Sequence, residues 1–295
     1  MLHLVSGCGP MSVRRLGAGL ALLLGLAWDG PCAIAEGPVL APHRAVYDME
    51  LATTHGGSSL SAITGRIVYE LTGSPCNGYS QNIRVVMQMV NDNGGATLTD
   101  QRLTTWEDAA GKRYRFDSSE FRDAKLTEAA AGDAVRPNKS GAVKVELTKP
   151  AKKDLALPER VYFPVQHMMA LVDAAKAGKT SLRANLYEGS EKGEKVYDTV
   201  SVIGHRWTPE RERKLEPVKN AEALNRMPAW PVSIAHFEQT NNKEDALPVY
   251  EQTFVLFENG VSRRLYLDYG NFAIAGTLKE ISFLPLEKCS GSGPR

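Results

Sequence analysis

The sequence contains little cysteine, with four residues in 295: Cys8, Cys32, Cys76 and Cys289. If the chain is cut after Ala35, only Cys76 and Cys289 remain, near the two ends of what is left. A bridge between them would close most of the chain into one loop, which predicts a single domain of an oxidising compartment. Because neither thiol would then be free, we expect no cysteine-based metal site.

The chain also lacks an excess of charge of either sign. It has 35 Lys and Arg against 34 Asp and Glu, and loss of residues 1–35 leaves 33 of each because Arg14, Arg15 and Asp29 go with them. Nucleic-acid binding depends on a basic surface that neutralises phosphates. The neutral charge therefore argues against nucleic acid as a partner.

Long apolar runs are missing except near the N-terminus, at residues 16–28. An arginine pair at 14–15 precedes this run and a small-x-small tripeptide at 33–35 follows it, which is the order of a secretory signal. Thirteen residues are too few for a membrane-spanning helix. We therefore predict a cleaved signal peptide at 1–35 and a periplasmic, not membrane-spanning, mature domain at 36–295.

Other interpretations of the N-terminal segment fit its residues less well. Asp29, Gly30 and Pro31 are a poor match to the residues that precede a lipidated cysteine, here Cys32. The arginine pair lacks the flanking residues of the twin-arginine route. Met11 lies just upstream of the basic start, so the true start stays open between it and the first methionine.

Motifs of known catalytic sites are missing as well. The sequence has no Gly-x-Ser-x-Gly, Ser-x-x-Lys or His-Glu-x-x-His motif and no glycine-rich phosphate loop, and its six histidines lie far apart. Adjacent acidic residues such as Glu107 and Asp108 would point to opposite faces of a strand, and we expect them to be solvated. The sequence thus predicts a protein that is not an enzyme, with no metal and no cofactor.

What the mature sequence does contain is a long series of alternating apolar and polar residues, typical of half-buried strands. Asn91–Gly95 reads as a tight turn, residues 132–141 read as a loop, and Asn259-Gly260 reads as a type I′ hairpin turn. We predict about eleven or more strands, in the ranges 45–51, 65–71, 79–90, 96–106, 112–116, 142–147, 181–187, 195–203, 232–239, 249–258, 261–269 and 272–284.

One segment has helical periodicity instead. Between Pro164 and Ala177 the apolar residues recur at intervals of three and four, Pro164 suits the first turn, and Gly178 suits the exit. We expect this helix to pack on the sheet as core, and the alternative is a plug or lid over a cavity.

These elements predict a mainly β protein, a large antiparallel sheet that curls or closes into a barrel. A barrel with this many strands is too wide for its own side chains to fill, so its interior could hold a ligand. Methionine and tryptophan suit an adaptable apolar pocket. The predicted lining residues are Met87, Met89, Trp106 and Met168.

Four segments carry a resemblance to a known family: 43–48 (HRAVYD), 65–70 (GRIVYE), 76–79 (CNGY) and 278–285 (LKEISFLP). With them the chain resembles the envelope integrity protein B family, a former domain of unknown function in periplasmic proteins of alphaproteobacteria. The resemblance implies an incompletely closed β-barrel with helical decoration, similar to periplasmic lipoprotein carriers. It also implies a family disulfide at Cys76 and Cys289 and a role in cell-envelope integrity, and it carries over no catalytic residues.

Together these observations favour a periplasmic, non-enzymatic protein that supports the cell envelope. We expect it to bind either an apolar ligand, such as a lipid or a lipoprotein acyl chain, or a periplasmic or outer-membrane protein. One alternative is a structural or interaction scaffold whose barrel is filled by the helix at 164–177. A hydrolase of envelope polymers is the other, and it requires carboxylates that converge in a cleft with perturbed pKa values.

Overall fold

The structure of the protein is a computed structural model that describes residues 38–137, 142–208, 216–239 and 246–289. Every described element belongs to the unit Glu36–Arg295. The predicted signal peptide and the two candidate start residues lie outside the described residues. Among the helices that are described, none is long and apolar enough to cross a bilayer.

The described chain is mainly β, as predicted, with one α-helix, α1 (Pro164–Lys176), close to its predicted bounds. Two short 3-10 turns, η1 (Glu191–Gly193) and η2 (Glu222–Leu224), are the remaining helical elements there. The strands are β1 (His43–Thr54), β2 (Leu60–Ser74), β3 (Gly78–Asn91), β4 (Ala96–Glu107), β5 (Arg113–Arg122), β6 (Lys125–Val135), β7 (Val143–Lys149), β8 (Lys153–Leu157), β9 (Val161–Tyr162), β10 (Ser181–Leu186), β11 (Tyr197–Ile203), β12 (Ala229–Glu238), β13 (Tyr250–Phe257), β14 (Ser262–Asp268) and β15 (Phe272–Phe283).

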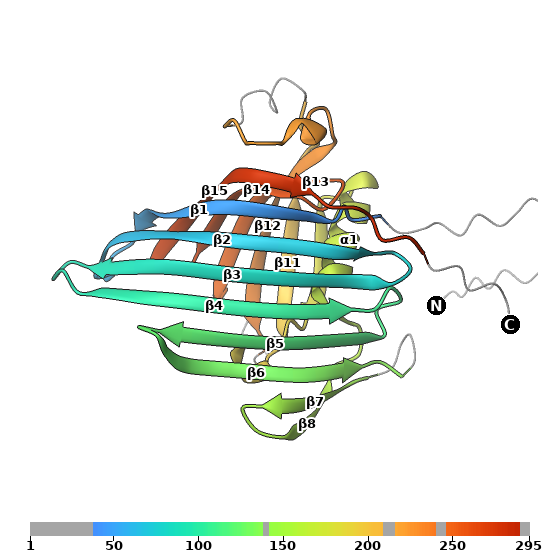
Figure 1. Ribbon diagram of the computed structural model, residues 1–295, viewed down its shortest axis with the longest axis horizontal. Helices are drawn as coiled ribbons and strands as arrows, with labels where there is room; N and C mark the ends of the chain where they lie inside the picture. The colour runs from blue at the N-terminus through green and yellow to red at the C-terminus, as the bar shows by residue number, and fades with distance from the viewer. Residues whose placement is uncertain (1–37, 138–141, 209–215, 240–245, 290–295) are drawn as a thin grey trace, which may run out of the picture. The chain divides into compact units, whose positions relative to one another are not determined.

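All fifteen strands form one sheet, which curls into a barrel that stays open at one seam. Its order runs from β8 through β1, across to β15, and down to β9, so β8 and β9 are the two edges. Neighbouring strands are antiparallel except β9 and β10, which α1 connects as a parallel crossover. Figure 1 shows β1–β6 running across the view, with β11–β13 crossing steeply behind them.

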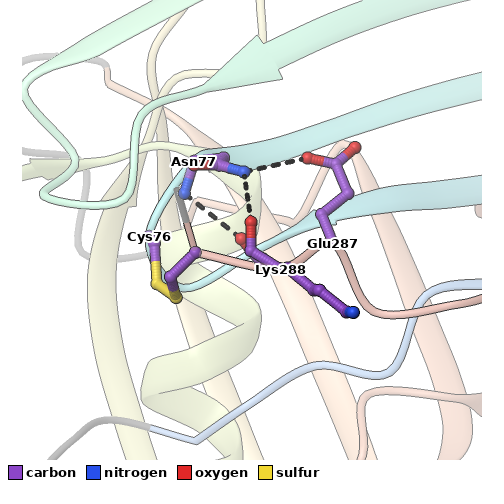
Figure 2. Close-up of a disulfide and its surroundings, with 6 residues drawn as sticks. Cys76, Asn77, Glu287 and Lys288 are labelled. Carbon is purple, nitrogen blue, oxygen red and sulfur yellow. Dashed lines mark hydrogen bonds between the residues drawn. A yellow bond between two sulfur atoms is a disulfide. The ribbon is translucent and has the colours of Figure 1, made fainter. Parts of the chain in front are cut away.

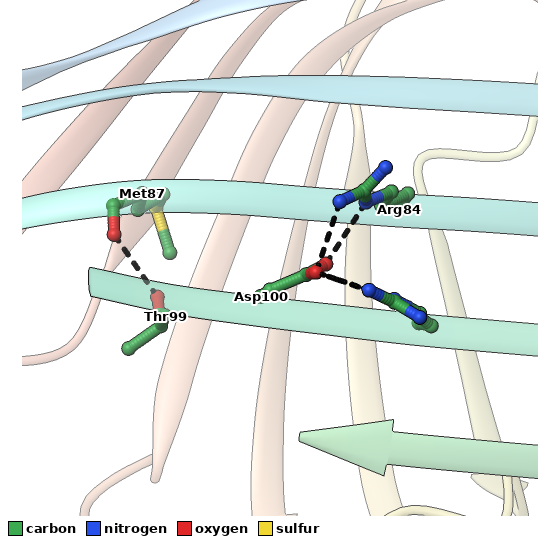
Figure 3. A network of polar contacts seen from close by, with 5 residues as sticks. Arg84, Met87, Thr99 and Asp100 are labelled. Atoms are coloured by element: carbon green, nitrogen blue, oxygen red, sulfur yellow. Dashed lines mark hydrogen bonds and ion pairs between the residues drawn. The ribbon is translucent and has the colours of Figure 1, made fainter. Parts of the chain in front are cut away.

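Strand alternation separates a charged outer face from an apolar inner face. On the outer face of β3 and β4, Asp100 binds the Arg84 guanidinium at 3.0 Å and the Arg102 guanidinium at 2.7 Å (Figure 3). These hydrogen bonds lower the pKa of Asp100 to about 2. Because such ion pairs are half-exposed to solvent, they favour strand register more than they add stability.

Helix α1 packs inside the barrel at one end, where it contacts both walls. Its Leu171 and Val172 pack against Val232 on β12, while Val165 packs against Leu71 on β2. Figure 1 shows the helix behind the ends of the long strands. The helix is therefore part of the core, as expected, and it fills this end of the interior.

The first turn of α1 is capped by a residue of another strand. Phe163, at the N-cap position, offers no side-chain cap. Instead the Glu107 carboxylate on β4 accepts hydrogen bonds from the backbone N–H of Val165 at 2.9 Å and of Gln166 at 3.0 Å. Glu107 is only 2% exposed, so its predicted solvation is wrong, and its burial raises its pKa to about 8.

Three strands, β6, β8 and β9, were missed by the prediction from the sequence. Strand β6 covers 125–135, so the predicted loop at 132–141 is wrong up to Val135, while 138–141 lie outside the described residues. The inner face of β6 carries small side chains, since Ala130 and Ala134 pack beneath the rings of Tyr114 and Phe116. The short edge strands β8 and β9 carry no alternating pattern long enough to detect.

The hairpin between β13 and β14 is confirmed, but its turn type is not. A type I′ turn needs positive φ at both Asn259 and Gly260. Only Gly260 has it, with φ of 86°, and its N–H donates to the Phe257 carbonyl oxygen at 2.9 Å. The Asn259 side chain instead accepts a hydrogen bond from the N–H of Val261 at 3.2 Å.

Candidate ligand cavity

The two cysteines that remain after Ala35 form a disulfide. Cys76 lies in the turn between β2 and β3, Cys289 follows β15, and their Cα atoms are 5.5 Å apart (Figure 2). Beside the bond, the Asn77 amide donates to the Glu287 carboxylate at 3.2 Å. The bridge ties the segment after β15 to the β2–β3 hairpin at the end of the barrel where α1 packs.

The barrel interior contains a cavity of about 390 Å³. That volume falls within the range of about 300–1,000 Å³ typical of small-molecule sites. One wall is the inner face of β3 and β4, where Ile83, Val85 and Leu103 remain only partly buried. The opposite wall is the segment Glu188–Glu191, between β10 and β11. The cavity is thus apolar on one side and polar on the other.

The polar wall carries carboxylates whose pKa values move in opposite directions. Burial raises the pKa of Glu188, although the hydroxyls of Ser190 and Tyr250 donate hydrogen bonds to it. Burial also acts to raise the pKa of Glu191, but hydrogen bonds from Lys195 and Tyr197 outweigh it and lower that pKa. The Lys195 Nζ lies 2.5 Å from the Glu191 carboxylate. Glu120 and Glu128 complete the acidic part of the lining.

No sequence pattern pointed to the Glu188–Glu191 segment. It follows a predicted strand and has no motif, yet its backbone adopts positive φ at Gly189 (75°), Glu191 (47°) and Lys192 (61°). At Gly189 an added Cβ would lie 2.5 Å from the Phe116 ring, so only glycine fits there. Residues with positive φ other than glycine are uncommon and cost energy, which shows that the surrounding contacts hold this conformation.

Two buried histidines lie between α1 and the back wall of the barrel. His167 on α1 is 4% exposed and His236 on β12 is 0% exposed. Burial lowers the pKa of His167 to about 4 and that of His236 to about 3, the latter also because His167 is near. The His236 ring stacks on Tyr250 at 4.1 Å between ring centroids. Both imidazoles are therefore neutral at neutral pH.

The predicted lining residues are not brought together in one place. Met87 and Met89 continue the inner face of β3 beyond Val85 and pack in a cluster with β1 and β2 residues. Met168 on α1 packs near Leu71 and Tyr79 at the end of the barrel that α1 fills. All three methionines face inward and stay partly exposed.

Trp106 lies on the opposite face of the sheet. Its neighbours on β4, Thr105 and Glu107, are buried inside, so strand alternation turns the indole outward. There the Arg115 guanidinium lies 5.1 Å from its ring centroid, on the outer face of β5. This position does not fit the predicted lining role of Trp106.

No group of three or more histidine, cysteine or acidic side chains that could hold a metal ion exists among the described residues. The arrangement can instead hold an apolar group against β3 and β4, with a polar group of the same ligand directed at the Glu188–Glu191 segment.

Comparisons of this chain with known sequences and structures support the barrel fold. A sequence profile described as EipB-like matches residues 34–285. The cell envelope integrity protein EipB of Brucella abortus (strain 2308) is 35% identical over 270 residues, which cover 91% of this chain and 93% of that protein. A crystal structure described as a β-barrel-like protein of the domain of unknown function DUF1849, also from Brucella abortus, has a TM-score of 0.75 and 34% identity. That similarity covers 83% of this chain and 99% of that one. The chain therefore belongs to the EipB-like family.

Proposed function

We propose that the mature protein, residues 36–295, is a single periplasmic domain that supports cell-envelope integrity by binding an apolar ligand inside its barrel. The ligand class is an acyl chain of a lipid or lipoprotein. The name of the Brucella relative supports the envelope role. The predicted signal peptide at 1–35 and the disulfide support the oxidising compartment.

The observation that carries the binding proposal is the inner face of β3. In a packed core the apolar residues of that face would be fully buried. Instead Ile83, Val85, Met87 and Met89 all remain partly exposed inside the barrel, and the first two line the cavity. Apolar surface that a fold leaves inside a concave site marks a ligand-binding surface.

Hydrolysis is a second candidate, because carboxylates with separated pKa values face the cavity. A catalytic pair needs one carboxylate free to act as base or nucleophile. Here Glu191 is held by Lys195 and Tyr197, and Glu188 by Ser190 and Tyr250. These contacts occupy both groups, so the geometry favours binding over catalysis.

The test uses two neighbouring valines of β3 that point to opposite faces. Val85→Trp places an indole in the cavity, and Val86→Trp places the same group on the outer face as the matched control. Binding of a fluorescent fatty acid to the purified mature protein is measured for each variant. We expect Val85→Trp to lose binding and Val86→Trp to retain it, with similar melting temperatures.

Equal binding by both variants would place the ligand elsewhere and contradict the proposal. No binding by the wild type, together with recovery of an envelope protein partner, would favour the scaffold alternative. Cleavage of envelope glycans that Glu188→Gln abolishes would favour the hydrolase.

A further inference from the structure

The edge of β10 is only partly covered by a neighbouring strand. Its last two residues, Asn185 and Leu186, pair with β9, whereas Ser181–Ala184 have no strand partner among the described residues on that side. Arg160, the residue just before β9 begins, adopts a left-handed backbone with φ of 60°. The described part of the chain thus leaves about 13 Å of open strand edge, at roughly 3.3 Å per residue.

A pocket of about 670 Å³ lies beside this open edge. It is lined by the guanidinium groups of Arg136, Arg160 and Arg183 and by one carboxylate, Asp198, which gives it a formal charge of +2. The side chain of Arg183 is 75% exposed, and its guanidinium forms an ion pair with the Asp198 carboxylate at 2.5 Å. Arg160 forms no ion pair with any described residue.

Arg136 is fixed in place at this pocket. Its guanidinium donates to the backbone carbonyl oxygens of Gly111, at 2.9 Å, and Val161, and it stacks over the Phe163 ring at 5.1 Å from the centroid. A cation that the fold already positions costs no ordering entropy when an anion binds. The pocket therefore offers a preorganised positive charge near the strand edge.

The two faces of β10 differ in chemistry along the same stretch. Arg183 lies on the outer face of β10, whereas Leu182 packs inward against the core and Ala184 is buried while also lining the pocket. A strand added to this edge would place alternate side chains beside the arginines and the remaining ones beside apolar groups. That pattern describes an extended segment with alternating acidic and apolar residues.

We propose that an extended acidic segment of a partner protein binds here as an added strand along Ser181–Ala184. Main-chain hydrogen bonds to the open edge supply affinity, and acidic side chains beside the arginines supply specificity. A second copy of this chain is disfavoured as the occupant, because it would bring its own arginines against this pocket. The site is separate from the barrel cavity and does not depend on the function proposed above.

The experiment measures binding of a labelled peptide of alternating Val and Glu, about eight residues long, to the purified mature protein by fluorescence anisotropy. A second peptide has Lys in place of Glu, and a third carries N-methyl groups on the alternate amides that would face β10. The test variant is Arg160→Glu with Arg183→Glu. Its matched control is Arg66→Glu on the outer face of β2, since Arg66 pairs with Asp48 as Arg183 pairs with Asp198.

We expect the Glu peptide to bind the wild type and the Arg66→Glu variant equally, and to bind the double variant at least about tenfold more weakly. The Lys and N-methylated peptides should not bind. Equal binding of the N-methylated peptide would show surface attraction without strand pairing and overturn the proposal. So would the absence of binding by the Glu peptide up to about 1 mM. Melting curves of both variants verify that they are folded.

Discussion

Removal of the disulfide should destabilise the domain mainly through the unfolded chain. Cys76 and Cys289 are 213 residues apart, and the loop-entropy model gives about 5 kcal/mol for a closure of that length. For a domain of this size about 1 kcal/mol corresponds to about 2–4 °C in melting temperature. Cys76→Ser should therefore melt roughly 10–20 °C below the wild type. The nearby contacts of Asn77 are exposed and add little.

The assay is thermal unfolding followed by circular dichroism, with Cys76→Ser, Cys289→Ser and the double variant compared with oxidised and reduced wild type. Thiol counting on the oxidised wild type should find no free thiol in the mature chain. All three variants and the reduced wild type should melt together. A melting temperature unchanged by the substitutions would refute the argument that this closure stabilises the fold. A double variant much less stable than either single variant would show a role for each side chain beyond the bond.

The other predictions concern buried ionisable groups and the N-terminus. Glu107→Ala should cost about 2–4 kcal/mol in urea unfolding because two buried N–H groups of α1 lose their acceptor. Because the pKa of Glu107 is raised from 4.5 to about 8 in the folded state, wild-type stability should fall relative to Glu107→Gln as the pH rises from 4.5 to about 8 and then level off. A constant difference over that range would refute this. Burial lowers the pKa of His167 from 6.5 to about 4, so the neutral imidazole contributes fully to the free energy of unfolding above pH 6.5. About 3 kcal/mol of that free energy should be lost as the pH falls from 6.5 through 4. His167→Gln should make that acid limb shallower without removing it, because the buried His236 also has a lowered pKa, of about 3, and an unchanged pH profile would refute the cause. N-terminal sequencing of periplasmic protein should begin at Glu36, and a longer chain would contradict cleavage after Ala35.

The sequence was sufficient where strand alternation was strong. Strand β3 was placed within one residue at each end because apolar residues occupy every second position from Ile83 to Met89. Strand β6 was missed because alanine and glycine, which are depleted in strands, fit beneath the Tyr114 and Phe116 rings. Pairing with its neighbours overrides that weak local preference.

The candidate site was harder to predict because its parts come together only in the folded barrel. The disulfide followed from the cysteine count alone, since only two cysteines remain after Ala35. Glu188, opposite the apolar wall, lies in the segment between β10 and β11, which contains no recognisable sequence motif. Glu107 reads as a solvated acid in the sequence, and only the helix that reaches it from far along the chain explains its burial.

Native mass spectrometry of protein purified from the periplasm tests the central claim most directly. The account predicts that the wild type and Val86→Trp carry the added mass of a lipid or acyl chain, and that Val85→Trp carries none. If the folded wild type is found only at its own mass, or if Val85→Trp retains the added mass, the barrel interior is not the binding site and the account is contradicted.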